Sequence, residues 1–125
     1  MTPQPPKKIL IVDDETDTLR LLRLRLEKKG YQITACENGK DALLEAQKTT
    51  PDLAILDIKL SDMTGYDILK KFKANPALKN VPVIFSTADA SVALKQTVRA
   101  HEANDYVIKP YDAHQLLKKI EALLH

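Results

Sequence analysis

Several features that mark large classes of protein are scarce in this sequence. Its single cysteine, Cys36, excludes an internal disulfide framework and is typical of a reducing compartment. No apolar run approaches the length of a membrane span, and the first eight residues lack the apolar segment of a secretory signal. We therefore expect a soluble, cytoplasmic domain that makes no contact with a membrane.

An excess of one charge is also missing. The chain has 19 lysines and arginines against 17 aspartates and glutamates, which gives a formal net charge of +2. Its lysines gather in two short clusters, which are Lys70, Lys71 and Lys73, and then Lys118 and Lys119. No aromatic residues alternate with them, as stacking on single-stranded nucleic acid requires. We interpret both clusters as solvated helix faces rather than a patch for an acidic partner, and we expect no direct contact with nucleic acid.

The length and the apolar content of the chain predict one domain. A chain of 125 residues that is 44% hydrophobic can bury one core but is too short for two ordinary domains. Residues 1–7 are polar and rich in proline, so we expect a disordered tail there and a single domain over residues 8–125.

Short apolar runs alternate with amphipathic segments along this domain, and they predict strands and helices respectively. The expected strands cover residues 8–12, 32–36, 51–57, 81–87 and 105–108. The expected helices cover residues 17–29, 40–48, a segment ending at Asn75–Pro76, residues 91–100 and a last helix after Asp112. Such alternation produces a parallel sheet covered on both faces, with right-handed crossovers. We predict an α/β, flavodoxin-like doubly wound (βα)5 fold with strand order 2-1-3-4-5.

Polar side chains stand where several predicted strands end. The third strand is apolar until it stops on Asp57, and ligands of open α/β sheets bind outside the carboxyl ends of the strands. The ends of the first, third, fourth and fifth strands would bring together Asp13, Asp14, Asp57, Thr87 and Lys109. Each residue alone has an ordinary structural explanation, such as a helix cap or a solvated side chain. Their convergence at one edge favours a shared site.

This set of side chains suits phosphoryl transfer. Close carboxylates are ligands for a hard divalent cation such as Mg²⁺, which also takes phosphate oxygens. Lys109 offers a point charge for phosphate, and Thr87 offers a hydroxyl donor. Asp57 would be the nucleophile that forms an aspartyl phosphate, with the metal and the lysine stabilising charge on the moving group.

The same strand-end motifs, taken as a set, resemble those of receiver domains of two-component response regulators. The resemblance covers residues 8–124. It rests on Val12-Asp13-Asp14-Glu15, on Leu56-Asp57, on Gly65, on Pro82-Val83-Ile84 leading to Thr87-Ala88, and on Asp105-Tyr106 leading to Lys109-Pro110.

The resemblance implies a role for each acidic residue. Asp57 matches the phosphoacceptor, which takes its phosphoryl group from a histidine on a sensor histidine kinase or a histidine phosphotransfer protein. Asp14 resembles the direct ligand of Mg²⁺ (or Mn²⁺), and Asp13 a ligand that acts partly through water. The metal would also take the backbone carbonyl of Lys59. Lys109 would contact the phosphoryl oxygens, and its peptide bond to Pro110 would be cis.

The resemblance also implies a switch and an output. Thr87 and Tyr106 match the switch pair, in which the hydroxyl moves toward the phosphate and the ring swings inward. This repacks the surface of the fourth helix, the fifth strand and the fifth helix, and so changes the binding of a downstream protein. We expect a monomer or a weak phosphorylation-dependent dimer, and no enzymatic turnover beyond the domain's own phosphorylation and dephosphorylation.

Two positions depart from the family pattern, and two more bear on the lifetime of the phosphate. Ser61 stands where the family often has proline, so we expect a more mobile loop after Asp57. Glu102 replaces a common glycine, so we expect a turn of different shape. Lys59 and Asp89 have opposite charges, and we hypothesise that they pair across the pocket and restrict water.

Leu21 and Leu24 fall on the side of the first helix away from its core face. Singly exposed leucines are common, so they need have no function. The alternative hypothesis is a patch beside the acidic site on which a partner docks.

Other functions remain open at this point. The chain resembles stand-alone chemotaxis or phosphorelay receivers, or equally a receiver cut from a longer protein. It could act as a phosphorylation-independent binding scaffold. A flavodoxin-like electron carrier would need a phosphate loop where Asp13 and Asp14 stand. A phosphohydrolase of the haloacid dehalogenase type would need an acid where Lys59 stands.

Overall fold

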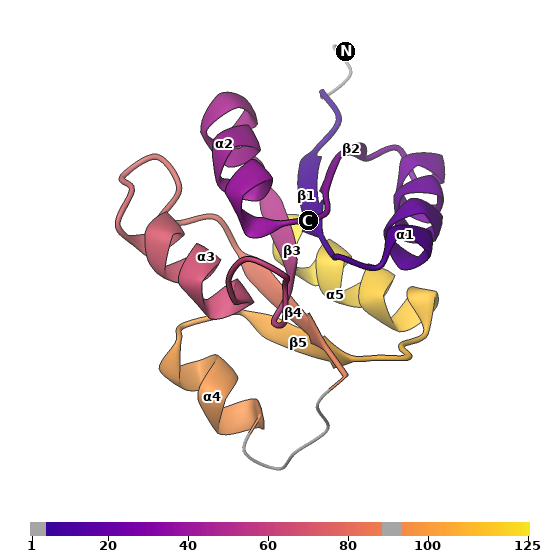
Figure 1. Ribbon diagram of the computed structural model, residues 1–125. Coiled ribbons are helices and arrows are strands. Elements are labelled where there is room, and N and C mark those ends of the chain that lie inside the picture. The colour runs from indigo at the N-terminus through magenta and orange to yellow at the C-terminus, as the bar shows by residue number, and fades with distance from the viewer. Residues whose placement is uncertain (1–4, 89–93) are drawn as a thin grey trace.

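Five parallel strands form one sheet at the centre of the fold, in the order β2-β1-β3-β4-β5 (Figure 1). The computed structural model describes residues 5–88 and 94–125. Its elements are β1 (Lys8–Val12), α1 (Thr16–Lys28), β2 (Gln32–Cys36), α2 (Gly39–Thr49), β3 (Leu53–Asp57), α3 (Gly65–Lys73), β4 (Val83–Thr87), α4 (Leu94–Ala100), β5 (Asp105–Ile108) and α5 (Ala113–Leu124). The predicted fold class and strand order are confirmed.

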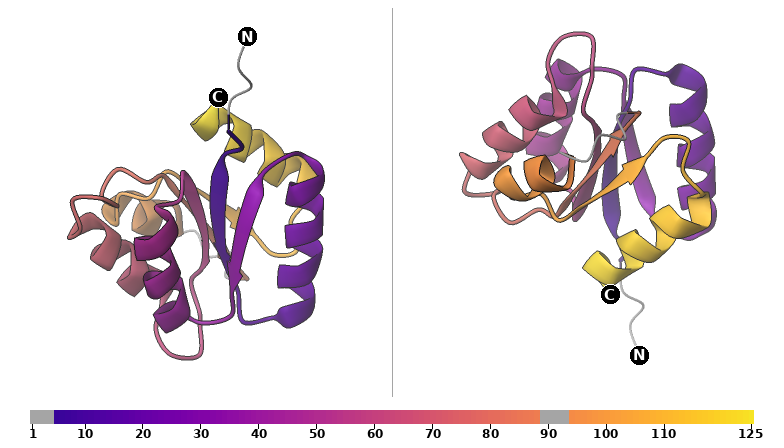
Figure 2. Two further views of the ribbon diagram at one scale, coloured as in Figure 1. Left: turned by 90° about the horizontal axis from the view of Figure 1, so that it is seen from above. Right: turned by 90° about the horizontal axis from the view of Figure 1, so that it is seen from below.

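The helices cover both faces of the sheet (Figure 2). α1 and α5 pack on one face, where Leu19, Leu22 and Leu26 are buried as their helical spacing predicts. α2, α3 and α4 pack on the other face, against a second buried cluster that includes Phe72 and Phe85. Because the strands are apolar on both sides, each face of the sheet has its own core. Buried polar side chains then stand at the ends of the strands.

Element boundaries differ little from those predicted. α1 runs one residue earlier than expected at each end. β4 begins at Val83 rather than Val81, because Pro82 has no N–H for the sheet and contributes only its carbonyl, which accepts a hydrogen bond from Ala54 N–H at 3.0 Å. The predicted start of the fourth helix, at residue 91, lies outside the described residues.

Two helix starts differ from the sequence-based expectation. Thr64 and Asp67 form a capping box at the start of α3, which the sequence analysis missed. The sequence also predicts a box of Asp112 with Gln115 at α5. Instead, the Asp112 carboxylate accepts a hydrogen bond from His114 N–H at 2.9 Å.

The turn before β5 contains a non-glycine residue in the left-handed region. Glu102 has a φ of 61°, a conformation that glycine adopts without strain. The turn therefore has a shape in which glycine would be favoured.

Lys7, the last residue of the predicted tail, contacts β2, because its carbonyl accepts a hydrogen bond from Gln32 N–H at 2.9 Å.

Among the described residues, no helix combines the length and the apolar content that crossing a membrane requires.

Candidate functional site

The carboxyl ends of four strands converge at one edge of the sheet, and each presents a predicted site residue there. The pairing of Val12 with Leu56 aligns the ends of β1 and β3, and the pairing of Asp57 with Ser86 aligns β3 with β4. Thr87 pairs with Ile108 in the same way. Residues that follow these positions are therefore neighbours in space, although they are distant in the sequence.

The three predicted acids form one cluster. Carboxylate oxygens of Asp13, Asp14 and Asp57 all lie within 4.8 Å of one another. Asp13 and Asp57 are buried, each with 6% of its surface exposed, whereas Asp14 faces solvent. Two buried acids and one exposed acid are a suitable oxygen donor set for a hard cation that reaches the site from solvent.

Lys109 links the two buried acids. Its Nζ lies 2.7 Å from Asp13 Oδ2 and 3.0 Å from Asp57 Oδ2, and its side chain is only 13% exposed. Glu15 Oε1 is 3.5 Å away on the solvent side. The sequence analysis did not assign Glu15 to the site, although the run of acids that ends on it was the available signal.

Burial and charge shift the protonation equilibria of this pair. Burial raises the pKa of the Asp57 carboxyl, and the charge of Asp13 acts in the same direction, against the hydrogen bond and charge of Lys109. For Lys109, burial alone lowers the pKa, but the hydrogen bonds and charges of Asp13 and Asp57 raise it above its ordinary value of 10.5. The lysine is therefore cationic at neutral pH, and the desolvated Asp57 relies on it for charge compensation.

A scan against family models matches residues 9–121 to the response regulator receiver domain. The chain belongs to this family. Curated relatives include the response regulator ArlR of Staphylococcus saprophyticus, 35% identical over 94% of this chain and 52% of the relative. The phosphate regulon transcriptional regulatory protein PhoB of Rhizobium meliloti is 32% identical, with the same two coverages. The chain thus spans about half the length of these curated relatives.

Solved structures of receiver-like proteins have the same fold. The chemotaxis protein CheY4 of Vibrio cholerae superposes with a TM-score of 0.89 at 29% identity, covering 95% of this chain and 99% of CheY4. A putative response regulator from Chloroflexus aurantiacus also gives 0.89, at 31% identity, covering 95% of this chain and 98% of that one. These matches extend over nearly the whole length of both chains.

The remaining predicted site residues of this receiver domain lie around the acidic cluster. Lys59 N–H donates to Asp57 Oδ1 at 3.3 Å, so its backbone borders the site. Thr87 is buried, and its carbonyl accepts a hydrogen bond from Lys109 N–H at 2.7 Å. Tyr106 is half-buried against the core on the α2, α3 and α4 face. The Lys109–Pro110 peptide bond is cis, as the resemblance implies.

The loop after Asp57, for which Ser61 led us to expect greater mobility, is held by hydrogen bonds at both of its ends. The Asp62 carboxylate accepts hydrogen bonds from Gly39 N–H and Lys40 N–H, both at 2.9 Å, at the start of α2. These bonds lower the pKa of Asp62. At the far end of the loop, Gly65 N–H donates to Ile58 O at 2.8 Å. Asp62 was missed because its partners are remote in the sequence.

The hypothesised pairing of Lys59 with Asp89 cannot be placed, because Asp89 lies outside the described residues.

Two further residues lie next to predicted site residues, and the sequence analysis did not assign them to the site. Burial and the charge of Asp13 raise the pKa of Tyr111, which follows Pro110. Ser86 pairs with Asp57 across β3 and β4, and its hydroxyl is buried with no hydrogen-bond partner among the described residues.

Proposed function

We propose that Asp57 accepts a phosphoryl group from a phosphohistidine in a Mg²⁺-dependent reaction. The donor is a sensor histidine kinase or a histidine phosphotransfer protein. The observation that carries this proposal is the placement of Asp57 within 4.8 Å of two other carboxylates and 3.0 Å from the Lys109 ammonium.

The transfer forms one bond and breaks one. A carboxylate oxygen of Asp57 attacks the phosphorus as the phosphorus–nitrogen bond to imidazole breaks, and imidazole leaves with the electron pair. Asp13, Asp14 and the Lys59 carbonyl would hold the cation, which would neutralise negative charge on the phosphoryl oxygens. Lys109 already donates to Asp57 Oδ2, so it is positioned to donate to an oxygen of a group bound there.

Phosphorylation would then change the surface formed by α4, β5 and α5. Thr87 ends β4 beside the site, and Phe85, two residues earlier on β4, pairs with Tyr106 of β5. A move of the Thr87 hydroxyl toward the phosphate would open space into which Tyr106 can turn. The output is a change in affinity for a downstream protein rather than turnover of a substrate.

The test is intact-mass spectrometry after incubation with acetyl phosphate and Mg²⁺. We expect one added phosphoryl group, lost in Asp57→Asn and in the metal-free control. Lack of an adduct would be followed by NMR with fluoroberyllate. A complex there would mean that the adduct forms but is short-lived. No complex in a folded protein would overturn the proposal in favour of a phosphorylation-independent scaffold.

A further inference from the structure

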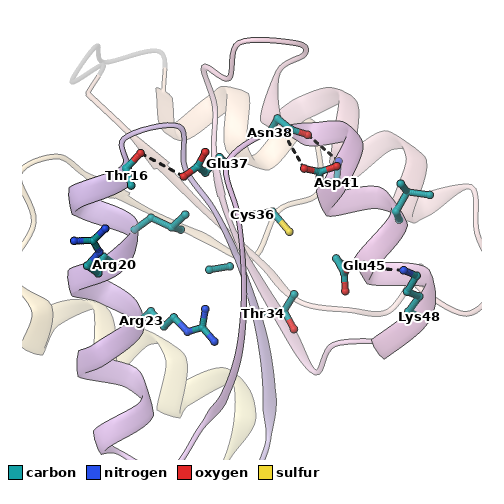
Figure 3. A pocket seen from close by; sticks show the side chains of 13 residues that line it. Thr16, Arg20, Arg23, Thr34, Cys36, Glu37, Asn38, Asp41, Glu45 and Lys48 are labelled. Carbon is teal, nitrogen blue, oxygen red and sulfur yellow. Dashed lines mark hydrogen bonds and ion pairs between the residues drawn. The ribbon is translucent and has the colours of Figure 1, made fainter.

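The outer side of the edge strand β2 forms the floor of an open cleft between α1 and α2. The cleft has a volume of about 670 Å³, and Thr34, Ala35 and Cys36 of β2 lie along its base. Figure 3 shows Arg20 and Arg23 on the α1 side of the strand, and Asp41, Glu45 and Lys48 on the α2 side. This cleft is separate from the pocket at Asp57.

The backbone of β2 has hydrogen-bonding capacity on this open side. Gln32 N–H donates to Lys7 O, and Cys36 O accepts from Asp13 N–H, so residues 32, 34 and 36 direct their backbone groups toward β1. In a parallel pair, the alternate residues Ile33 and Ala35 direct theirs away. The N–H and C=O groups of these two residues can therefore pair with an added strand.

β2 also lacks the features that usually prevent such pairing. Its sequence, Gln-Ile-Thr-Ala-Cys, contains no charged residue and no proline. The opposite edge strand, β5, begins with Asp105, whose carboxylate lies 2.9 Å from Lys119 Nζ. Small side chains at positions 34–36 leave the outer side of β2 open, which is unusual for an edge that has to remain unpaired.

The two walls of the cleft carry different charges. On the α1 wall, Arg23 pairs with Glu27 at 3.5 Å, whereas Arg20 has no ion-pair partner among the described residues. The α2 wall presents Asp41 and Glu45, with the largely exposed Lys48 beyond them, 3.9 Å from Glu45. At one end, Thr16 donates a hydrogen bond to Glu37, which lies at the rim.

We propose that this cleft binds an extended segment of a partner protein, which adds to the sheet beside β2 and in which acidic and basic side chains alternate. Side chains of a strand point alternately to its two faces, and residues i and i+2 are about 6.8 Å apart. Its acids would face Arg20 and Arg23, which are separated by about 4.5 Å along α1, and its bases would face Asp41 and Glu45, separated by about 6 Å along α2. Backbone bonds supply affinity, and the two charged walls supply selectivity.

A second copy of this chain fits the cleft less well. Antiparallel pairing of two β2 strands requires a two-fold axis perpendicular to the sheet, which places α1 beside α1. The arginines of the two copies would then face each other and repel. The segment therefore comes from a different protein, and the proposal requires no phosphorylation of Asp57.

The test uses two blocked peptides of identical composition on the whole chain. One has eight residues of strictly alternating Glu and Lys, and the other repeats Glu-Glu-Lys-Lys, which mixes both charges on each face. NMR titration should give an affinity about fivefold to tenfold higher for the alternating peptide, since each exposed ion pair contributes modestly. Hydrogen exchange of the Ile33 and Ala35 amides should slow when this peptide binds.

Protein variants locate the interaction. Arg20→Glu combined with Arg23→Glu should weaken binding of the alternating peptide by a similar factor. Arg25→Glu, on the side of α1 toward α5, should change it less than twofold and serves as the control. Equal affinity for both peptides, unchanged exchange at Ile33 and Ala35, or equal sensitivity to Arg25→Glu would overturn the proposal. So would concentration-dependent protection of these amides without peptide, which would indicate a dimer through β2.

Discussion

At the scale of single residues, the site is defined by two buried carboxylates that share one lysine. Asp13 and Asp57 each accept a hydrogen bond from Lys109, and the two acids are close enough to repel. Burial raises the pKa of Asp57 despite this partner, so the charged state of Asp57 is costly in the folded protein. The charge of Asp57 therefore lowers the stability of the fold, and a cation bound beside it would reduce this cost.

The cost of the Asp57 charge predicts opposite effects of two substitutions on stability in metal-free buffer. Lys109→Met should lower the free energy of unfolding by about 3 kcal/mol, because it leaves two buried acids unpaired. Asp57→Asn should leave it unchanged or raise it, because it removes a desolvated charge and retains the shape. Urea denaturation measures both. If Asp57→Asn lowered the free energy of unfolding more than Lys109→Met does, the carboxylate of Asp57 would stabilise the fold.

At the scale of elements, the start of α3 packs directly against the end of β3. A Cβ added to Gly65 would lie 2.6 Å from the backbone carbonyl oxygen of Asp57 and 3.2 Å from the Ile58 Cα. Backbone atoms cannot move aside without displacing Asp57. For a Cβ added at Gly39, by contrast, the three nearest atoms all belong to the side chain of Met63.

The two glycines form a matched pair for substitution. Gly65→Ala should destabilise the fold by about 1–3 kcal/mol through overpacking, and should slow phosphorylation by acetyl phosphate because Asp57 shifts. Gly39→Ala should affect phosphorylation much less, since the flexible Met63 side chain can adopt another rotamer. Thermal unfolding and the rate of adduct formation report the two effects. Equal phosphorylation rates in both variants would contradict this view of the β3–α3 contact.

The capping box of α3 predicts a pH dependence. Hydrogen bonds from Thr64 lower the pKa of Asp67 below its ordinary value of 3.8. A lowered folded-state pKa means that the stabilising contribution is complete above pH 3.8 and is lost as pH falls through the lowered value. The stability difference between wild type and Asp67→Asn should therefore shrink as pH falls below about 4.

Chemical denaturation at a series of pH values measures this difference. Asp17→Asn is the control, because Asp17 also lies in the first turn of a helix but makes no side-chain hydrogen bond among the described residues. A pH-independent difference for Asp67→Asn would exclude a contribution from the carboxylate charge.

At the scale of the protein, the exposed leucines of α1 lie near the edge of the sheet at which Lys109 stands. Leu21 and Leu24 are 53% and 54% exposed, so they lie outside the core as predicted. Leu21 lines a groove of about 800 Å³ that reaches Lys109 and Pro110. The hypothesis that a partner docks on Leu21 and Leu24 left that partner unspecified. Because the groove reaches Lys109, we propose that the partner is the protein that donates the phosphoryl group.

The double variant Leu21→Ala with Leu24→Ala should slow transfer from a phosphorylated histidine-containing protein. Transfer from acetyl phosphate should be unchanged, because a small donor needs no docking surface. Leu44→Ala is the matched control, since Leu44 is 49% exposed on α2, away from this groove. The free energy of unfolding of each variant should stay within about 0.5 kcal/mol of wild type. Equal slowing with both donors would place the effect in the site itself.

The local pattern of apolar and polar residues was sufficient to predict much of this structure. The apolar runs identified every strand, and the helical spacing of Leu19, Leu22 and Leu26 identified the face of α1 that is buried. Strand ends follow from the same pattern, because a parallel strand that stops on Asp57 must deliver it to the carboxyl edge. The fold class, the strand order and the cluster of Asp13, Asp14 and Asp57 could therefore be predicted from the sequence alone.

The sequence predicted that Lys109 and Asp13 lie at the same edge of the sheet, but their direct contact is visible only once the elements are packed together. Lys109 and Asp13 are 96 residues apart, yet they lie 2.7 Å from each other, and Asp62 reaches the start of α2 across 23 residues. The close approach of Gly65 to Asp57 and the open cleft beside β2 likewise depend on how neighbouring elements pack. Periodicity determines which side of an element is buried, because burial responds to local spacing. Distances between side chains of different elements depend on how those elements pack in three dimensions, which local spacing does not encode.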